Sequence, residues 1–119
     1  LGISMNFTTQ RIEDIVVFTL NETKLDANNS GLVKAEFTLL MKLESVKKLI
    51  IDLTDVESCD STGLSALLVA NRLVHANDGD VCLVTSSEKV LSLIRITQLN
   101  KVLSVFDTLT DALQELKSK

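Results

Sequence analysis

The run Asp60-Ser61-Thr62-Gly63 contains the hydroxyl groups whose setting in this chain best suits chemistry. An apolar run at residues 49–53 precedes it, and a stretch rich in Leu and Ala follows. Because a carboxylate accepts hydrogen bonds from the free amides of a first helical turn, Asp60 is expected to cap a helix. Ser61 and Thr62 then lie in that turn, where the helix dipole tolerates added negative charge. The pattern predicts a switch, a hydroxyl that can carry a phosphate while its helix stays intact.

The same four residues are also explained by helix capping alone. Ser, Thr and Asp favour helix starts because their side chains hydrogen-bond to nearby backbone groups. For an Asp-Ser-Thr run in an uncharacterised chain, capping is the commoner explanation. The surroundings of the motif therefore have to decide between a cap and a switch.

A hydrolytic role for Ser61 is disfavoured by its surroundings in the sequence. The serine lacks the Gly-x-Ser-x-Gly elbow of the hydrolases. The sole histidine, His75, is about four turns further along the predicted helix, roughly 20 Å away and beyond hydrogen-bond reach. We interpret His75 as a solvated surface residue and predict no catalytic residue.

Acidic residues gather around the end of the apolar run, at Asp52, Asp55, Glu57 and Asp60. Carboxylates beside a Ser or Thr can bind Mg²⁺ together with phosphates, so a metal site is one interpretation. No glycine-rich loop accompanies them to cradle the phosphates of a nucleotide. We favour a solvated acidic loop, which a kinase can also recognise, and expect neither a bound metal nor a cofactor.

Composition is typical of a single cytoplasmic domain. The 119 residues, 45% of them apolar and 24% charged, suffice for one buried core. The net charge of −4 and the lack of a basic cluster argue against nucleic-acid binding. No run approaches the ~18 apolar residues of a membrane span, so no membrane insertion is expected. We assign residues 5–119 to the domain and interpret residues 1–4 as a leftover of recombinant expression.

The two cysteines, Cys59 and Cys82, do not have the spacing of a metal site. Reduced thiols in the cytoplasm explain them best. Cys59 lies next to the predicted helix start, a position that can lower the pKa of a thiol. Redox sensing by Cys59 therefore stays open beside a simple packing role.

Strand and helix signals alternate along the chain. Strands are predicted at residues 6–11, 15–20, 48–53, 80–85 and 105–106, the first two joined by a tight turn. Helices are predicted after the capping residues 28–30 and at residues 61–76, 88–97 and 109–117. The first helix is expected to bury the residues that recur at helical spacing, Leu32, Ala35, Leu39, Leu40 and Leu43. Together they predict an α/β fold, a mixed four- to five-stranded sheet with about four helices packed on it.

The helix predicted at residues 61–76 presents two different faces. At 100° per residue, one narrow stripe holds Ser61, Ser65, Leu68, Arg72 and His75, with Leu64 at its border. The opposite, core-facing surface holds Gly63, Ala66, Leu67, Ala70, Leu73 and Val74. Leu68 thus stands among polar residues on the face of Ser61. It is either an ordinary exposed leucine or part of a docking patch for a partner.

Residues 49–68 resemble the anti-sigma factor antagonists of bacteria, members of the STAS domain family. That family shows an apolar strand, an acidic loop and then Asp-Ser-Ser/Thr-Gly-Leu-Gly at the head of a helix. The motif here is Asp60-Ser61-Thr62-Gly63-Leu64-Ser65, and the resemblance extends from about Met5 over nearly the whole chain. One departure is the turn at residues 20–26, which lacks the family's glycine, is one residue longer and carries Lys24 where Glu is usual.

The resemblance implies a regulator of transcription that is not an enzyme and forms a monomer or a weak dimer. Its unphosphorylated form binds an anti-sigma factor with serine kinase activity, which frees a sigma factor. The kinase phosphorylates Ser61, and a phosphatase removes the phosphate. Asp60 is implied to orient Ser61, Thr62 to be the neighbouring hydroxyl, and Gly63 to let the kinase approach. Contacts with the partner are implied at Asp26, Leu64, Ser65, Leu68 and Arg72.

Two other functions stay open. In one, the domain is a STAS scaffold subunit of a membrane transport complex, such as a lipid-transport ATPase, and the same surface is a fixed contact. In the other, it is a sensor of a small ligand. The intact Asp-Ser-Thr-Gly run favours the phosphorylation switch.

Overall fold

Strands and helices alternate along residues 4–119, the part of the chain that this computed structural model describes. The strands are β1 (Phe7–Ile12), β2 (Ile15–Leu20), β3 (Lys24–Leu25), β4 (Lys48–Asp52), β5 (Ser58–Cys59), β6 (Asp80–Val84) and β7 (Ser104–Phe106). The helices are α1 (Ser30–Glu44), α2 (Ser61–His75), α3 (Glu88–Ile96), the 3₁₀ helix η1 (Leu99–Lys101) and α4 (Leu109–Lys117). The expectation for residues 1–4 falls mainly on residues 1–3, outside the described part.

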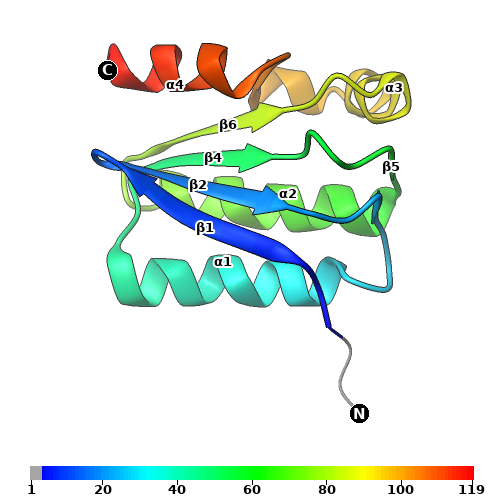
Figure 1. Cartoon of the computed structure of the whole chain (residues 1–119), viewed down its shortest axis with the longest axis horizontal. Helices are drawn as coiled ribbons and strands as arrows, with labels where there is room; N and C mark the ends of the chain where they lie inside the picture. The colour runs from blue at the N-terminus through cyan, green and yellow to red at the C-terminus, as the bar shows by residue number, and fades with distance from the viewer. Residues whose placement is uncertain (1–3) are drawn as a thin grey trace.

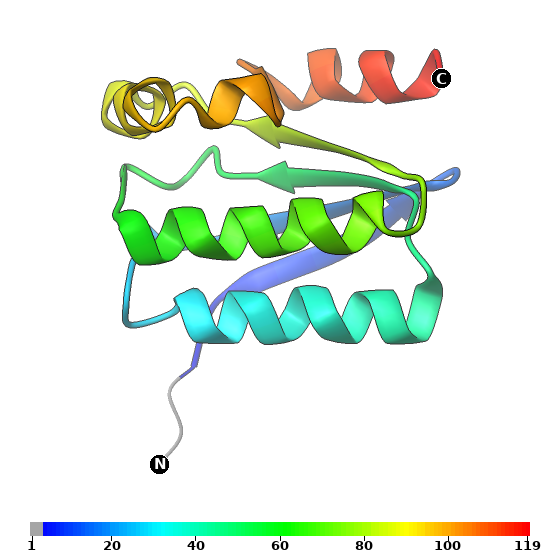
Figure 2. The same cartoon turned by 180° about the vertical axis from the view of Figure 1, so that it is seen from behind.

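The main sheet has five strands in the order β1-β2-β4-β6-β7. β1 and β2 form an antiparallel hairpin, and the other neighbours pair in parallel. α1 and α2 lie side by side on one face of the sheet, and α4 lies on the other (Figures 1 and 2). The predicted mixed sheet with four α-helices is confirmed. No helix in the described residues is long and apolar enough to cross a membrane.

Alternate residues of the strands serve the two faces of the sheet, as the twofold period of a strand requires. In β2, Val16, Phe18 and Leu20 join the core under α1 and α2, whereas Ile15 and Val17 join the core under α4. Phe37 of α1 meets Phe18 edge-on, with ring centroids 5.0 Å apart.

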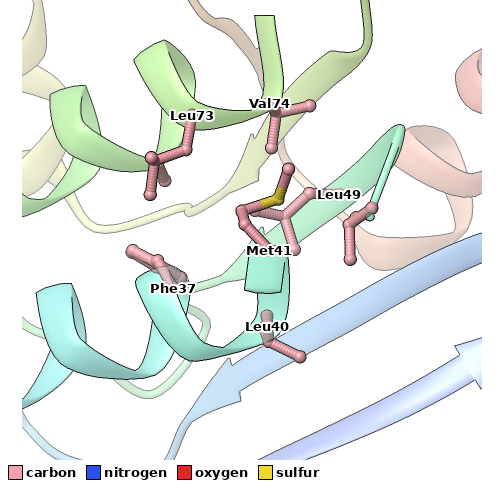
Figure 3. Close-up of a pocket in the computed structure, with 8 residues that line it drawn as sticks. Phe37, Leu40, Met41, Leu49, Leu73 and Val74 are labelled. Atoms are coloured by element: carbon pink, nitrogen blue, oxygen red, sulfur yellow. The ribbon is translucent and has the colours of Figure 1, made fainter. Parts of the chain in front are cut away.

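The seam between α1 and α2 is filled by apolar side chains from both helices. Met41 of α1 reaches toward Val74 of α2 beside Leu49 of β4 (Figure 3), and Phe37, Leu40 and Leu73 also line this seam. The described side chains that line this seam leave no room for a water molecule. The seam is therefore core packing, and its role is to fix α2 on the sheet.

The buried face predicted for α1 is right at Leu40 and wrong at the other four positions. The structure buries Val33, Phe37 and Leu40, while Leu39 is 48% and Leu43 is 73% exposed. Leu32 is only half-buried and Ala35 is exposed. The helix carries leucines on both sides, so counting them favours the wrong stripe. The aromatic ring of Phe37 decides the orientation because it fills the space above Phe18.

Element ends differ from the prediction by one or two residues. α2 ends at His75, followed by Asp78 in the left-handed conformation (φ 59°) and by a hydrogen bond from the Gly79 amide to the Val74 carbonyl. Gly79 is needed for space, since a Cβ there would lie 2.4 Å from the Lys47 carbonyl oxygen. The two-residue strands β3 and β5, which pair in parallel, had no signal in the sequence because two residues show no period.

The topology gathers several connections at one end of the molecule. Parallel strands β2, β4 and β6 end at the same edge of the sheet, so residues 21–29, 53–60 and 85–87 meet there. The first turn of α2 begins at this edge, near β5 and α3 (the right-hand end in Figure 1). The fold thus places the motif around Ser61 among three loops.

Candidate functional site

Asp60 caps α2, as predicted. Its Oδ1 accepts hydrogen bonds from the Thr62 amide (2.9 Å) and the Gly63 amide (3.1 Å). The Thr62 hydroxyl also donates to this oxygen, at 2.5 Å. These bonds favour the charged carboxylate, so they hold the pKa of Asp60 below its usual value, with the Thr62 hydroxyl as the largest cause.

The two hydroxyls beside the cap have different environments. Thr62 is half-buried and its hydroxyl is bound to Asp60. Ser61 is exposed in the first turn, and its hydroxyl makes no hydrogen bond within residues 4–119. The Ser61 hydroxyl is therefore free to react, while the Thr62 hydroxyl helps to hold the helix start.

The turn at residues 20–26 is fixed against the start of α2. The Asp60 amide donates to the Leu25 carbonyl (3.2 Å), and the Glu57 amide donates to the Thr23 carbonyl (2.8 Å). Lys24 and Asp26 line, with Ser58, Cys59 and Asp60, an open hollow of about 220 Å³. Asp26 and the exposed Lys24 therefore lie beside the cap, although the turn lacks a glycine.

From the far side of the site, the Ser87 hydroxyl donates to the Glu57 carbonyl at 2.8 Å. The same oxygen caps α3, because it accepts a hydrogen bond from the Val90 amide (3.3 Å). The acidic loop is thus held by α3 as well as by β3, so the site is built from fixed segments.

Gly63 has a different role from the one implied by the resemblance. It is buried, and a Cβ at this position would lie 2.5 Å from the Leu25 carbonyl oxygen and 2.6 Å from the Cys59 sulfur. The missing side chain admits the backbone of β3, not an approaching kinase. The glycine is needed for the close contact between β3 and α2.

Of the two roles left open for Cys59, the structure favours packing over redox sensing. Burial, followed by the nearby charges of Asp60 and Asp26, raises the pKa of this thiol to about 12. Cys59 is therefore a packing residue and is poorly suited to redox sensing.

Asp52 and Asp55 of the acidic loop are occupied within the protein. Asp52 is buried and accepts hydrogen bonds from the amide and hydroxyl of Thr54. Asp55 accepts from the Asn21 amide group at 3.2 Å. Across residues 4–119, no group of three or more His, Cys, Asp or Glu side chains is arranged to hold a metal ion. The Mg²⁺ interpretation therefore has no structural support.

The two faces of α2 agree with the sequence prediction, with two corrections. Gly63, Ala66, Leu67, Ala70 and Val74 are buried, while Ser61, Leu68, Arg72 and His75 are exposed and Ser65 is half-buried. Leu73 is half-buried in the seam with α1. Leu64 is only 6% exposed, so it belongs to the core and not to the protruding docking stripe.

A groove along the Ser61 face of α2 was not predicted from the sequence. Its first wall is formed by Ser61, Leu64, Ser65 and Leu68, and its second by Thr97, Gln98, Leu99 and Val102. The groove has a volume of about 320 Å³. Its walls are some thirty residues apart in the chain, so no local pattern could indicate it.

Known proteins of similar sequence and fold indicate one family, the one that the motif around Ser61 resembles. A family model described as the STAS domain matches residues 6–112, and the chain therefore belongs to the STAS domain family. A Thermotoga neapolitana protein named as a candidate anti-sigma factor antagonist is 28% identical over 113 residues, or 95% of this chain and 99% of the relative.

Solved structures show the same fold. The crystal structure of a candidate anti-sigma factor antagonist from Thermotoga maritima is 26% identical, covers 93% of this chain and 94% of that one, and has a TM-score of 0.80. The Bacillus cell fate determinant SpoIIAA in its phosphorylated form is 19% identical, covers 92% and 98%, and has a TM-score of 0.71. The second likeness is one of fold alone.

Gly63→Ala is expected to destabilise the protein by about 1–3 kcal/mol, because the added methyl forces β3 away from α2. Gly31→Ala is the matched control, since a Cβ there meets nothing within 4 Å and it lies in the first turn of α1. This control should leave stability unchanged or raise it by up to about 1 kcal/mol. Denaturant unfolding of both variants tests this, and equal stabilities would contradict the assigned role of Gly63.

Asp60→Asn should destabilise the protein at neutral pH and have a smaller effect in acid. Since the pKa of Asp60 is lower in the folded than in the unfolded chain, its charge stabilises the fold above the unfolded value of about 3.9. This stabilisation is lost as the pH falls through the folded-state pKa. Melting temperatures at pH 7, 5 and 3 should therefore converge toward pH 3, whereas a constant difference would refute the charged cap.

Proposed function

We propose that this STAS domain is an anti-sigma factor antagonist that is controlled by phosphorylation of Ser61. The observation that carries the proposal is the free, exposed hydroxyl of Ser61 at the capped start of α2. The names of its Thermotoga relatives and the existence of a phosphorylated protein of the same fold support it. In this function the unphosphorylated protein binds an anti-sigma factor and frees the sigma factor.

The chain itself supplies only the acceptor hydroxyl, so the protein is a substrate and not an enzyme. The anti-sigma factor is also the kinase and brings ATP and Mg²⁺. The Ser61 oxygen attacks the γ-phosphorus, ADP leaves and the hydroxyl proton is released. A phosphatase restores the serine by hydrolysis. The protein needs no cofactor of its own and acts in the cytoplasm as a monomer or weak dimer.

The hydrogen bonds around the cap explain why Ser61 is the acceptor and Thr62 is not. Phosphorylation of Thr62 has to break its bond to Asp60 and brings phosphate against that carboxylate. Phosphorylation of Ser61 breaks no hydrogen bond within the described residues. A phosphate in the first turn also interacts favourably with the helix dipole. The fold should therefore survive the modification.

The phosphate acts on binding because it lies on the docking face. Leu68 and Arg72 follow Ser61 along the exposed stripe of α2, and Asp26 lies on the other side of the cap. A phosphate adds about two negative charges to this surface. A partner that covers it with apolar or acidic groups then loses affinity through repulsion and desolvation.

The proposal is tested on Ser61 itself. With the cognate kinase and ATP, peptide mapping should find one phosphate, on Ser61 and not on Ser58, Thr62 or Ser65. Ser61→Ala should fold and bind the anti-sigma factor constitutively. Ser61→Glu should fold but bind at least ~10-fold more weakly, a loss of ~1.4 kcal/mol.

Calorimetric titration measures both affinities, with melting curves as the control for folding. A phosphate mapped elsewhere would overturn the assignment of Ser61. Equal affinities of the alanine and glutamate variants would favour a fixed contact, as in the scaffold subunit of a transport complex.

Leu68→Asp should abolish binding of the anti-sigma factor and leave stability nearly unchanged. Leu68 is 42% exposed, so it adds little to the core but can anchor an interface. The neighbouring Leu67→Asp is the matched variant, and it should unfold the domain because it places an unpaired carboxylate in the core. Binding and melting are measured for both. If a folded Leu68→Asp variant binds the anti-sigma factor as tightly as the parent, the face of α2 that carries Leu68 is not part of the interface.

A further inference from the structure

The exposed large apolar side chains of the described residues fall into two groups. Leu39 and Leu43 lie on α1, whereas Leu68, Ile96 and Val102 lie near Ser61. Leu68 and Val102 form opposite rims of the groove, and Ile96 lines the adjoining hollow beside Cys59. Leu68 and Val102 thus lie with Ser61 on the walls of one groove, whereas Ile96 lines a separate and open hollow.

The groove has an apolar base and a fixed second wall. The buried side chains of Leu64, in the first wall, and Leu99, in the second wall, supply its apolar base. The Leu99 carbonyl accepts hydrogen bonds from the amides of Val102 (3.0 Å) and Leu103 (2.9 Å), which holds the turn that carries Val102. Gln98 begins this turn in the left-handed conformation (φ 61°). The groove is thus formed before a partner arrives.

The charged residues closest in the chain to the rim residues Leu68 and Val102 are basic, and neither of them lines the groove itself. Arg72 continues the exposed stripe of α2 beyond Leu68, and Lys101 belongs to the same turn as Leu99 and Val102. Both are exposed, and neither forms an ion pair with another described residue. The nearest carboxylate along α2 is that of Asp60, beyond Ser61, and it is occupied by the first turn. Charge complementarity therefore favours an acidic ligand.

We infer that this groove binds an acidic amphipathic segment of the partner protein. Apolar side chains of the segment enter between Leu68 and Val102, and its carboxylates lie near Arg72 and Lys101. This inference rests on the proposed function and adds the second wall and the sign of the partner's charge. It also gives the phosphate a direct effect, because a phosphate on Ser61 at the end of the groove repels an acidic segment.

The first experiment uses a synthetic helical peptide as the probe, with leucines along one face and glutamates along the other. Its control is the same peptide with lysines in place of the glutamates. The acidic peptide should shift the amide NMR signals of Leu64, Leu68, Leu99 and Val102, and should bind at least ~10-fold more tightly than the lysine peptide. Equal binding of the two peptides, or signals that shift only on α1, would overturn the inference.

Variants of the second wall test binding in the groove independently of any change at Ser61. Val102→Asp places a charge at a site that is 53% exposed, so it should fold and lose at least ~10-fold in affinity for the acidic peptide and for the anti-sigma factor. Leu43→Asp on α1 is the control and should bind as the parent does. Val102→Ser removes the apolar side chain without adding a charge, so its loss of affinity should be smaller. A folded serine variant with reduced affinity shows that the loss does not come from misfolding.

The outcomes distinguish this inference from the proposed function. Suppose that Ser61→Glu weakens binding of the anti-sigma factor but Val102→Asp binds it as tightly as the parent. The assignment of the groove as a binding site is then wrong, and the proposed control through Ser61 is retained. If the acidic peptide binds in the groove but no anti-sigma factor binds the protein, the groove stands and the proposed function is wrong.

Discussion

The close contact between β3 and the first turn of α2 is the constraint on which the rest of the site depends. The Asp60 amide donates to the Leu25 carbonyl while the Asp60 carboxylate accepts the amides of Thr62 and Gly63. One residue thus links the loop after β2 to the helix after β4. The contact is possible only because Gly63 has no Cβ, which would lie 2.5 Å from the Leu25 oxygen. Every other feature of the site, including the exposure of Ser61, follows from this fixed start of the helix.

Much of the fold could be predicted because apolar residues recur at the regular spacing of a strand or a helix along its longer elements. The sequence indicated the hairpin, the parallel strands, the cap at Asp60 and the exposed stripe through Leu68, and the structure confirms them. Predictions failed where tertiary contacts decide. The side of α1 that is buried depends on the fit of Phe37 to Phe18, and the role of Gly63 depends on β3, which is too short to show a pattern. The pKa of the Cys59 thiol likewise depends on tertiary contacts, because burial and then the charges of Asp60 and Asp26 raise it.

The separation of Ser61 from the internal hydrogen bonds has a physical consequence for control. Thr62 and Asp60 hold the helix start, and the core residues Ala66 and Leu67 hold its position on the sheet. Ser61 belongs to neither set, so a charge added to it changes the surface and not the fold. Control of this kind needs no second conformation of the protein. In the proposed function, the loss of binding free energy on phosphorylation then comes from the repulsion and desolvation of groups on the partner.

The surface around Ser61 is asymmetric in charge, and this asymmetry suits its two proposed roles. On the β3 side lie Asp26 and Asp60, which a kinase can recognise by their charge. On the other side, Arg72 follows the rim residue Leu68 on α2, and Lys101 of η1 precedes the rim residue Val102. A partner that contacts both sides therefore has to present cations toward β3 and an acidic, apolar segment toward η1. Since Ser61 stands between the two sides, a phosphate there attracts the cations and repels the acidic segment. The loss of binding on phosphorylation thus depends on the groove contributing more to affinity than the acidic side does.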